Sequence, residues 1–138
     1  KRTVAPPLMQ TFDAADRESC IVRQQTTNTP LQALAMLNAP ILLEAALELA
    51  KSARSTIDLT PEAQVKYLFK KVLLRSPNDQ ELATLSQSYF KYQAMSRDER
   101  ESTIIELDKP NVKITPDFFP GFCISLTLLG LDETLSPK

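Results

Sequence analysis

The chain has 138 residues, of which 43% are apolar and 24% charged, and its net charge is −1; these values fit one globular domain with its own core. The near-neutral balance lacks the excess of Lys and Arg that a nucleic-acid-binding surface needs, so we expect no nucleic-acid partner. The absence of His removes the commonest general base and metal ligand, and two Gly are too few for a glycine-rich phosphate loop.

The N-terminal residues are predicted to form an extended arm over residues 1–12. Pro6 and Pro7 push the residues before them out of helical geometry. From there we expect a helical core over residues 13–138, so that the whole chain is a single domain. Its first short helix would begin with Asp13 as the cap and end near Cys20.

A strong helix-start signal follows in Thr29-Pro30-Leu31-Gln32, a capping box with Pro at the first helical position. It predicts a short helix near 30–37. Pro40 then interrupts the pattern, and apolar residues at helical spacing predict a longer helix near 39–55. Asn38 can cap that second helix.

The middle of the chain repeats this start signal. Thr60-Pro61 opens a helix that carries cations in its last turns, up to Arg75. Ser76-Pro77 ends this helix and caps the next, whose apolar face holds Leu82, Leu85, Tyr89 and Tyr92. Helical spacing favours core packing for the run Tyr89-Phe90-Lys91-Tyr92, although it can also stack against a sugar or a base. The capping box Ser96-Arg97-Asp98-Glu99 then predicts a short helix to about Leu107.

The last predicted helix starts at Thr115-Pro116 and ends at Gly130, which can cap it. Apolar residues occupy almost all of its sides: Phe118, Phe119, Phe122, Cys123, Ile124, Leu126, Leu128 and Leu129. A helix without a polar face is buried, and this one is too short to span a membrane. The predicted fold class is therefore all-α, an irregular bundle of about five to six helices around this apolar C-terminal helix, with an extended N-terminal arm.

The two cysteines, Cys20 and Cys123, match neither a metal pattern nor a redox C-x-x-C motif. They are either two buried free thiols or one disulfide that ties the start of the domain to its last helix. No C-x-x-C-H motif is present, so haem cannot be attached covalently to this domain and we expect no cofactor in it. Near the end of the chain, Asp132 and Glu133 can cap a helix, bind a cation or form salt bridges.

A group of polar side chains between positions 13 and 32 is the candidate site: Asp13, Asp16, Arg17, Glu18, Arg23, Gln25, Asn28 and Gln32. As a ligand site, these residues would supply carboxylates for acid–base chemistry and arginines for anions. As a structural cluster, they would be caps and a buried ion-pair network that satisfies an irregular backbone. No calcium-loop pattern accompanies the carboxylates, so we assign no metal site, and we assign no catalytic residue.

Several motifs carry a family resemblance: Phe12-Asp13-Ala14-Ala15-Asp16-Arg17-Glu18, Val22-Arg23, Thr27-Asn28-Thr29-Pro30-Leu31-Gln32-Ala33-Leu34, Leu37-Asn38-Ala39-Pro40 and Leu131-Asp132-Glu133-Thr134-Leu135. With them the chain resembles the C-terminal PSD-type domain of unknown function, named for planctomycete proteins. This family typically has a Gly-Arg turn before the Pro at position 77, where this chain has Leu74-Arg75-Ser76.

The resemblance implies the C-terminal part of a large protein exported to the periplasm or cell surface. A planctomycete-type cytochrome c domain would lie upstream, and any haem would belong there. We expect a non-catalytic helical module that docks on the upstream domains of the same polypeptide, or on a protein partner, and stabilises them. The alternative is that the polar group completes an active or ligand site shared with an upstream domain, with a polysaccharide as a possible ligand.

Overall fold

A computed structural model of the protein describes residues 29, 32, 34–35, 38–56, 60–107 and 113–135. The chain divides into two compact units, residues 1–39 and residues 40–138. The described residues form helices, turns and loops and contain no strand, which confirms the all-α fold class. The predicted arm and the predicted helix that starts at Asp13 lie outside the described residues, so the division into an arm and a single helical core stays a prediction.

In the first unit, the predicted capping box is present. The backbone N–H of Thr29 donates to Oε1 of Gln32 at 2.9 Å, and the N–H of Gln32 donates to Oγ1 of Thr29 at 3.3 Å. This reciprocal pair satisfies two N–H groups at a helix start. The prediction that Asn38 caps the next helix is wrong, because that helix begins at Pro40, two positions later. The Nδ2 of Asn38 instead donates to the carbonyl oxygen of Leu34 at 2.9 Å, four positions earlier in the chain.

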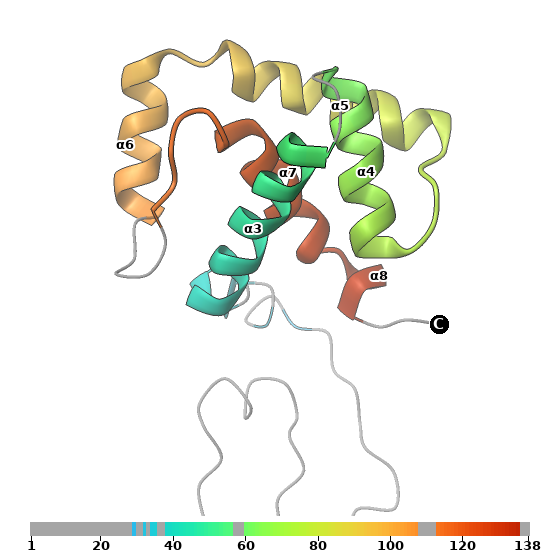
Figure 1. The fold of residues 1–138 in the computed structure, drawn as a ribbon. Helices are drawn as coiled ribbons and strands as arrows, with labels where there is room; N and C mark the ends of the chain where they lie inside the picture. The colour runs from blue at the N-terminus through green and yellow to red at the C-terminus, as the bar shows by residue number, and fades with distance from the viewer. Residues whose placement is uncertain are drawn as a thin grey trace, which may run out of the picture. The chain divides into compact units, whose positions relative to one another are not determined.

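The second unit is a succession of helices (Figure 1). In chain order they are α3 (Pro40–Thr56), α4 (Pro61–Leu73), α5 (Asp79–Ala94), α6 (Arg97–Leu107), α7 (Phe119–Leu129) and α8 (Asp132–Leu135). The helices predicted near 39–55, from Pro61 and up to Leu107 are confirmed. Within the described residues, no helix is long and apolar enough to cross a membrane.

The capping box predicted at the start of α6 is also confirmed. The N–H of Glu99 donates to Oγ of Ser96 at 3.2 Å, and the N–H of Ser96 donates to Oε2 of Glu99 at 3.0 Å. The two partners are three positions apart, so the whole capping box lies within one helical turn.

Helix α7 is the centre of the second unit, as predicted, and it packs against α3, α4 and α5 (Figure 1). Two of its aromatic residues join the α3 side chains in one buried cluster: Leu43, Ala46, Leu47, Ala50, Ile114, Phe119 and Phe122. Its later residues join α4 and α5 in a second cluster: Ala53, Val65, Leu68, Phe69, Tyr89, Ile124 and Leu128. Different sides of α7 face different clusters, so apolar residues are needed on every side of the helix and it has no polar face.

The ends of α7 differ from the prediction in detail. The helix begins at Phe119, later than predicted, because Thr115 and Pro116 form a turn in which the N–H of Phe118 donates to the Thr115 carbonyl at 3.1 Å. Gly130 is the C-terminal cap, as predicted, but its φ of −85° is not left-handed. Gly121 has a different role, since a Cβ there would lie 3.3 Å from Cβ of Ala50. A residue without a side chain therefore lets α3 and α7 approach closely.

Candidate functional site

The junction between α4 and α5 begins with a left-handed residue. Leu74 has φ 57° and ψ 16°, and its N–H donates to the carbonyl of Lys70 at 3.1 Å. Helix α4 therefore ends at Leu73, and the prediction that Arg75 lies in its last turns is wrong, because Arg75 lies beyond the helix end. This conformation costs a residue with a side chain about 1 kcal/mol. The side chain of Leu74 is nevertheless 87% exposed, so the domain itself gives it almost no compensating contact.

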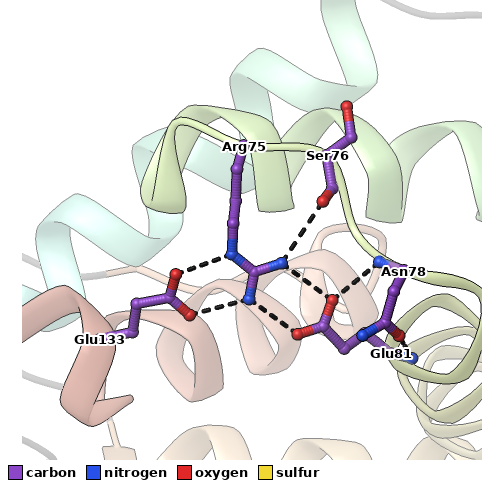
Figure 2. Close-up of polar contacts among 5 residues, drawn as sticks. All are labelled: Arg75, Ser76, Asn78, Glu81 and Glu133. Carbon is purple, nitrogen blue, oxygen red and sulfur yellow. Dashed lines mark hydrogen bonds and ion pairs between the residues drawn. The ribbon is translucent and has the colours of Figure 1, made fainter.

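The next residue, Arg75, is the centre of a polar network (Figure 2). Its Nη1 and Nη2 donate to the carboxylate of Glu81 at 3.0 and 2.7 Å. Its Nε and Nη2 donate to the carboxylate of Glu133 at 2.7 and 2.8 Å, and Nη1 also donates to the Ser76 carbonyl at 3.4 Å. The guanidinium lies over the ring of Phe69, 4.7 Å from its centroid. One side chain thus connects α4, α5 and α8.

Glu81 also belongs to the start of α5. Its Oε2 accepts from the N–H of Asn78 at 2.8 Å, and its own N–H donates to Oδ1 of Asn78 at 2.7 Å (Figure 2). Asn78 is therefore the cap of α5, and the prediction that Ser76 caps this helix is wrong. Ser76 instead offers its carbonyl to Arg75, and the helix begins only after the extended Asn78.

The charges of this network are mutually stabilised. Two contacts hold the pKa of Glu81 at about 2, below its ordinary 4.5. The hydrogen bonds from Arg75 have the larger effect, and the hydrogen bond from the N–H of Asn78 adds to it. The bonds to Glu133 and Glu81 raise the pKa of Arg75. All five N–H donors of the guanidinium are used within the protein. The network is therefore a structural clamp that fixes the turn carrying Leu74, and it leaves no donor of Arg75 for a ligand. The alternative in which Glu133 forms a salt bridge is confirmed, with Arg75 as its partner.

A second polar region is a shallow cleft of about 610 Å³ along α3, beside the start of α7. Its lining residues are Glu48, Lys51, Ser52, Arg54, Ser55 and Phe118. Arg54 connects the two elements, because its guanidinium lies 5.7 Å from the centroid of the Phe118 ring and its Nη1 donates to the carbonyl of Asp117 at 2.9 Å. This cleft was not predicted, since its two walls are far apart in the sequence.

The interior of the second unit contains polar groups with differing partners. The hydroxyl of Tyr89 donates to Oε1 of Gln64 at 2.8 Å, and burial raises the pKa of Tyr89. Oγ of Ser125 donates to the carbonyl of Gly121 at 2.8 Å. Oγ of Ser86 is buried without a hydrogen-bond partner. Unpaired buried hydroxyls are uncommon, so Ser86 marks a local cost in stability.

In the aromatic run on α5, Tyr89 and Tyr92 pack against the core as predicted, whereas Phe90 does not. Tyr89 is buried, and Tyr92 meets Phe119 edge to face, with ring centroids 6.2 Å apart and an interplanar angle of 88°. Phe90 is exposed. Cys123 carries a free thiol, and burial raises its pKa to about 12. Cys20, the other cysteine of the possible disulfide, lies outside the described residues.

Of the predicted polar group, the structure describes one member, Gln32, which is buried and bonded to Thr29. The other members lie outside the described residues: Asp13, Asp16, Arg17, Glu18, Arg23, Gln25 and Asn28. Whether they form a ligand site or a structural cluster stays open. Among the described residues, no group of three or more His, Cys, Asp or Glu could hold a metal ion.

Comparison with known proteins places the chain in a family. The family PSD1, described as "Protein of unknown function (DUF1553)", matches residues 1–89, which include the Thr29–Gln32 capping box, α3, α4 and the clamp residues Arg75 and Glu81. Searches of curated proteins and of solved structures return no match. The match spans more than half of the 138 residues and confirms the resemblance drawn from the motifs. The chain therefore belongs to the PSD1 family of proteins of unknown function (DUF1553).

Proposed function

We propose that this chain is a non-catalytic helical module that docks on another domain of its own polypeptide and stabilises it. The observation that carries the proposal is Leu74, which is left-handed and 87% exposed. Glycine would adopt this backbone conformation without strain. A large apolar side chain held there in water gains nothing within the domain, whereas it gains burial if another surface covers it.

The clamp beside Leu74 makes this side chain a suitable anchor. Arg75 uses all its donors to fix the turn, and Phe69, which lies under its guanidinium, is buried. The turn is therefore tied to α5 and α8 through Glu81 and Glu133. A side chain projecting from a rigid turn loses little conformational freedom on binding, which favours association.

The proposed occupant of this surface is an upstream domain of the same polypeptide. The family resemblance supports this choice, because such domains end large proteins with further domains before them. Export to the periplasm or cell surface belongs to the same proposal and has the same support. A separate protein that covers Leu74 is the competing outcome of the test.

Three substitutions of Leu74 separate docking from stability. Leu74→Gly removes both the side chain and the strain, so it should stabilise the 138-residue chain by about 1 kcal/mol and weaken docking. Leu74→Ala removes the side chain and keeps the left-handed strain, so it should weaken docking without stabilising the chain. Leu74→Met keeps a large apolar side chain and the left-handed strain, and it is the matched control. Stability is measured by urea unfolding of the 138-residue chain.

Docking is measured by hydrogen exchange of the backbone amides of residues 74, 75, 76 and 78, in the full-length polypeptide and in the 138-residue chain. We expect protection in the full-length wild type and in Leu74→Met, and less protection in the Gly and Ala variants. Equal exchange in both wild-type proteins would show that nothing covers the turn and would end the proposal. Protection that appears only after a separate protein is added would reject the same-polypeptide occupant.

A further inference from the structure

We infer that the cleft between α3 and the start of α7 binds a small hydroxylated carboxylate, with its carboxylate group on Arg54. Neither Leu74 nor Arg75 lines this cleft, so the docking proposal and this site can fail independently. The inference depends on three properties of the lining residues: an unused guanidinium edge, a second cation nearby, and hydroxyl and carboxylate oxygens beside them.

Arg54 is held in place by contacts that leave its recognition edge open. Its Nη1 donates to the Asp117 carbonyl, and the flat side of the guanidinium faces Phe118. In the part of the chain that the structure describes, Nε and Nη2 of Arg54 have no hydrogen bond or ion pair, and the residue is exposed. These two nitrogens form the edge that binds a carboxylate through two parallel N–H···O bonds. The guanidinium is thus positioned by the protein but not saturated, in contrast to Arg75.

Lys51 supplies a second cation from the same side of α3. Its Nζ lies 2.7 Å from Oε1 of Glu48, and both side chains are largely exposed. An exposed pair of this kind is worth little, so it can rearrange at small cost when a ligand enters. Lys51 can then attract the ligand carboxylate, while Glu48 accepts a hydrogen bond from a ligand hydroxyl. The two cations exceed the one carboxylate in the lining, which favours an anion.

The remaining polar lining suits a hydroxylated ligand. Oγ of Ser55 donates to the Ser52 carbonyl at 3.1 Å, so its lone pairs can accept from a ligand hydroxyl. Oγ of Ser52 shares a 2.8 Å hydrogen bond with the hydroxyl of Tyr67, which fixes its position. The cleft volume of about 610 Å³ falls within the range of small-ligand sites. An apolar ligand would make no hydrogen bond to these oxygens or to the open edge of Arg54.

The test is a titration of the isotope-labelled 138-residue chain with D-glucuronate, followed by NMR, with ionic strength held constant by sodium chloride. We expect saturable shifts of the amides at 51–55 and of the Arg54 Nε–H signal. Glucose lacks the charge and acetate lacks the hydroxyls, so each should bind at least about tenfold more weakly. No saturation with glucuronate, or equal binding of glucose, would overturn the inference.

Variants of the lining residues then test whether glucuronate binds in this cleft. Arg54→Gln should weaken glucuronate binding about tenfold, whereas Arg97→Gln, which removes an exposed arginine from the pair with Glu101 on α6, should leave binding unchanged. Because Arg54→Gln also removes the bond to Asp117, Lys51→Gln provides a second test that breaks no contact between helices, and it should weaken binding several-fold. Equal binding by Arg54→Gln, Lys51→Gln and the wild type would place the ligand elsewhere and reject the site.

Discussion

The hydrogen bond between Tyr89 of α5 and Gln64 of α4 allows a quantitative test of how the core is built. The two side chains are 8% and 6% exposed, and the hydroxyl donates to Oε1 at 2.8 Å. Tyr89→Phe keeps the ring and removes only the hydroxyl, so Oε1 of Gln64 is left where water has little access. An unpaired buried acceptor costs about 1–3 kcal/mol. We therefore expect Tyr89→Phe to lower the free energy of unfolding by about 2 kcal/mol.

The reciprocal change separates this cost from the loss of packing. Gln64→Met keeps the length of the side chain and removes the amide, which leaves the hydroxyl of Tyr89 without its acceptor. We expect a loss of similar size. In the double variant both polar groups are gone, and neither is left unpaired. The double variant should therefore be no less stable than either single variant, with a coupling of about 2 kcal/mol or more.

Urea unfolding followed by circular dichroism measures all four proteins, and an unchanged m value confirms that the unfolding reaction is the same. Tyr67→Phe is the matched control, because its hydroxyl bonds to Ser52 at 2.8 Å in a half-exposed position. Water can replace that partner, so the control should lose at most about 0.5 kcal/mol. Additive losses in the double variant, or a loss in the control as large as that of Tyr89→Phe, would refute the reasoning.

The remaining predictions concern one unpaired hydroxyl and one shifted carboxyl. Ser86→Ala should raise the free energy of unfolding by about 1 kcal/mol, because Oγ is buried without a partner; Ser125→Ala, whose Oγ is bonded, should bring no such gain in urea unfolding, and equal gains would contradict the prediction. The pKa of Glu81 is lowered from 4.5 to about 2, so its bond to Arg75 stabilises the fold fully above pH 4.5 and is lost as the pH falls towards 2. The difference in unfolding free energy between the wild type and Arg75→Met should therefore shrink over that range, and a constant difference would contradict this assignment.

The sequence predicted those helix starts that depend on neighbouring residues. In Thr29–Gln32 and Ser96–Glu99, both partners of the capping box lie within one turn, and the structure contains both boxes. The central position of α7 was also predictable, because a helix that is apolar on every side has to be buried. The division of its contacts between two clusters was not, since it depends on where α3 and α4 approach it.

The clamp was missed for two physical reasons. Arg75 and Glu133 are 58 positions apart, and no local pattern connects them. The break at Leu74 has no Gly or Asn to mark it, so the cations before it suggested a helix that continues to Arg75. The start of α5 could have been predicted from the sequence, because Asn78 and Glu81 have the spacing of a capping box. Ser76-Pro77 offered an earlier start signal, but the structure forms the capping box between Asn78 and Glu81.

The position of α7 in the chain has a consequence for how the protein is made. Both buried clusters include residues of α7, which follows α3, α4, α5 and α6 in the sequence. During synthesis, those helices leave the ribosome before the segment that covers their apolar faces exists. At about 5–20 residues per second, the delay between α3 and α7 is on the order of ten seconds. We expect nascent chains that end before Phe119 to be held by chaperones or degraded, and folding to begin only once Leu129 has emerged.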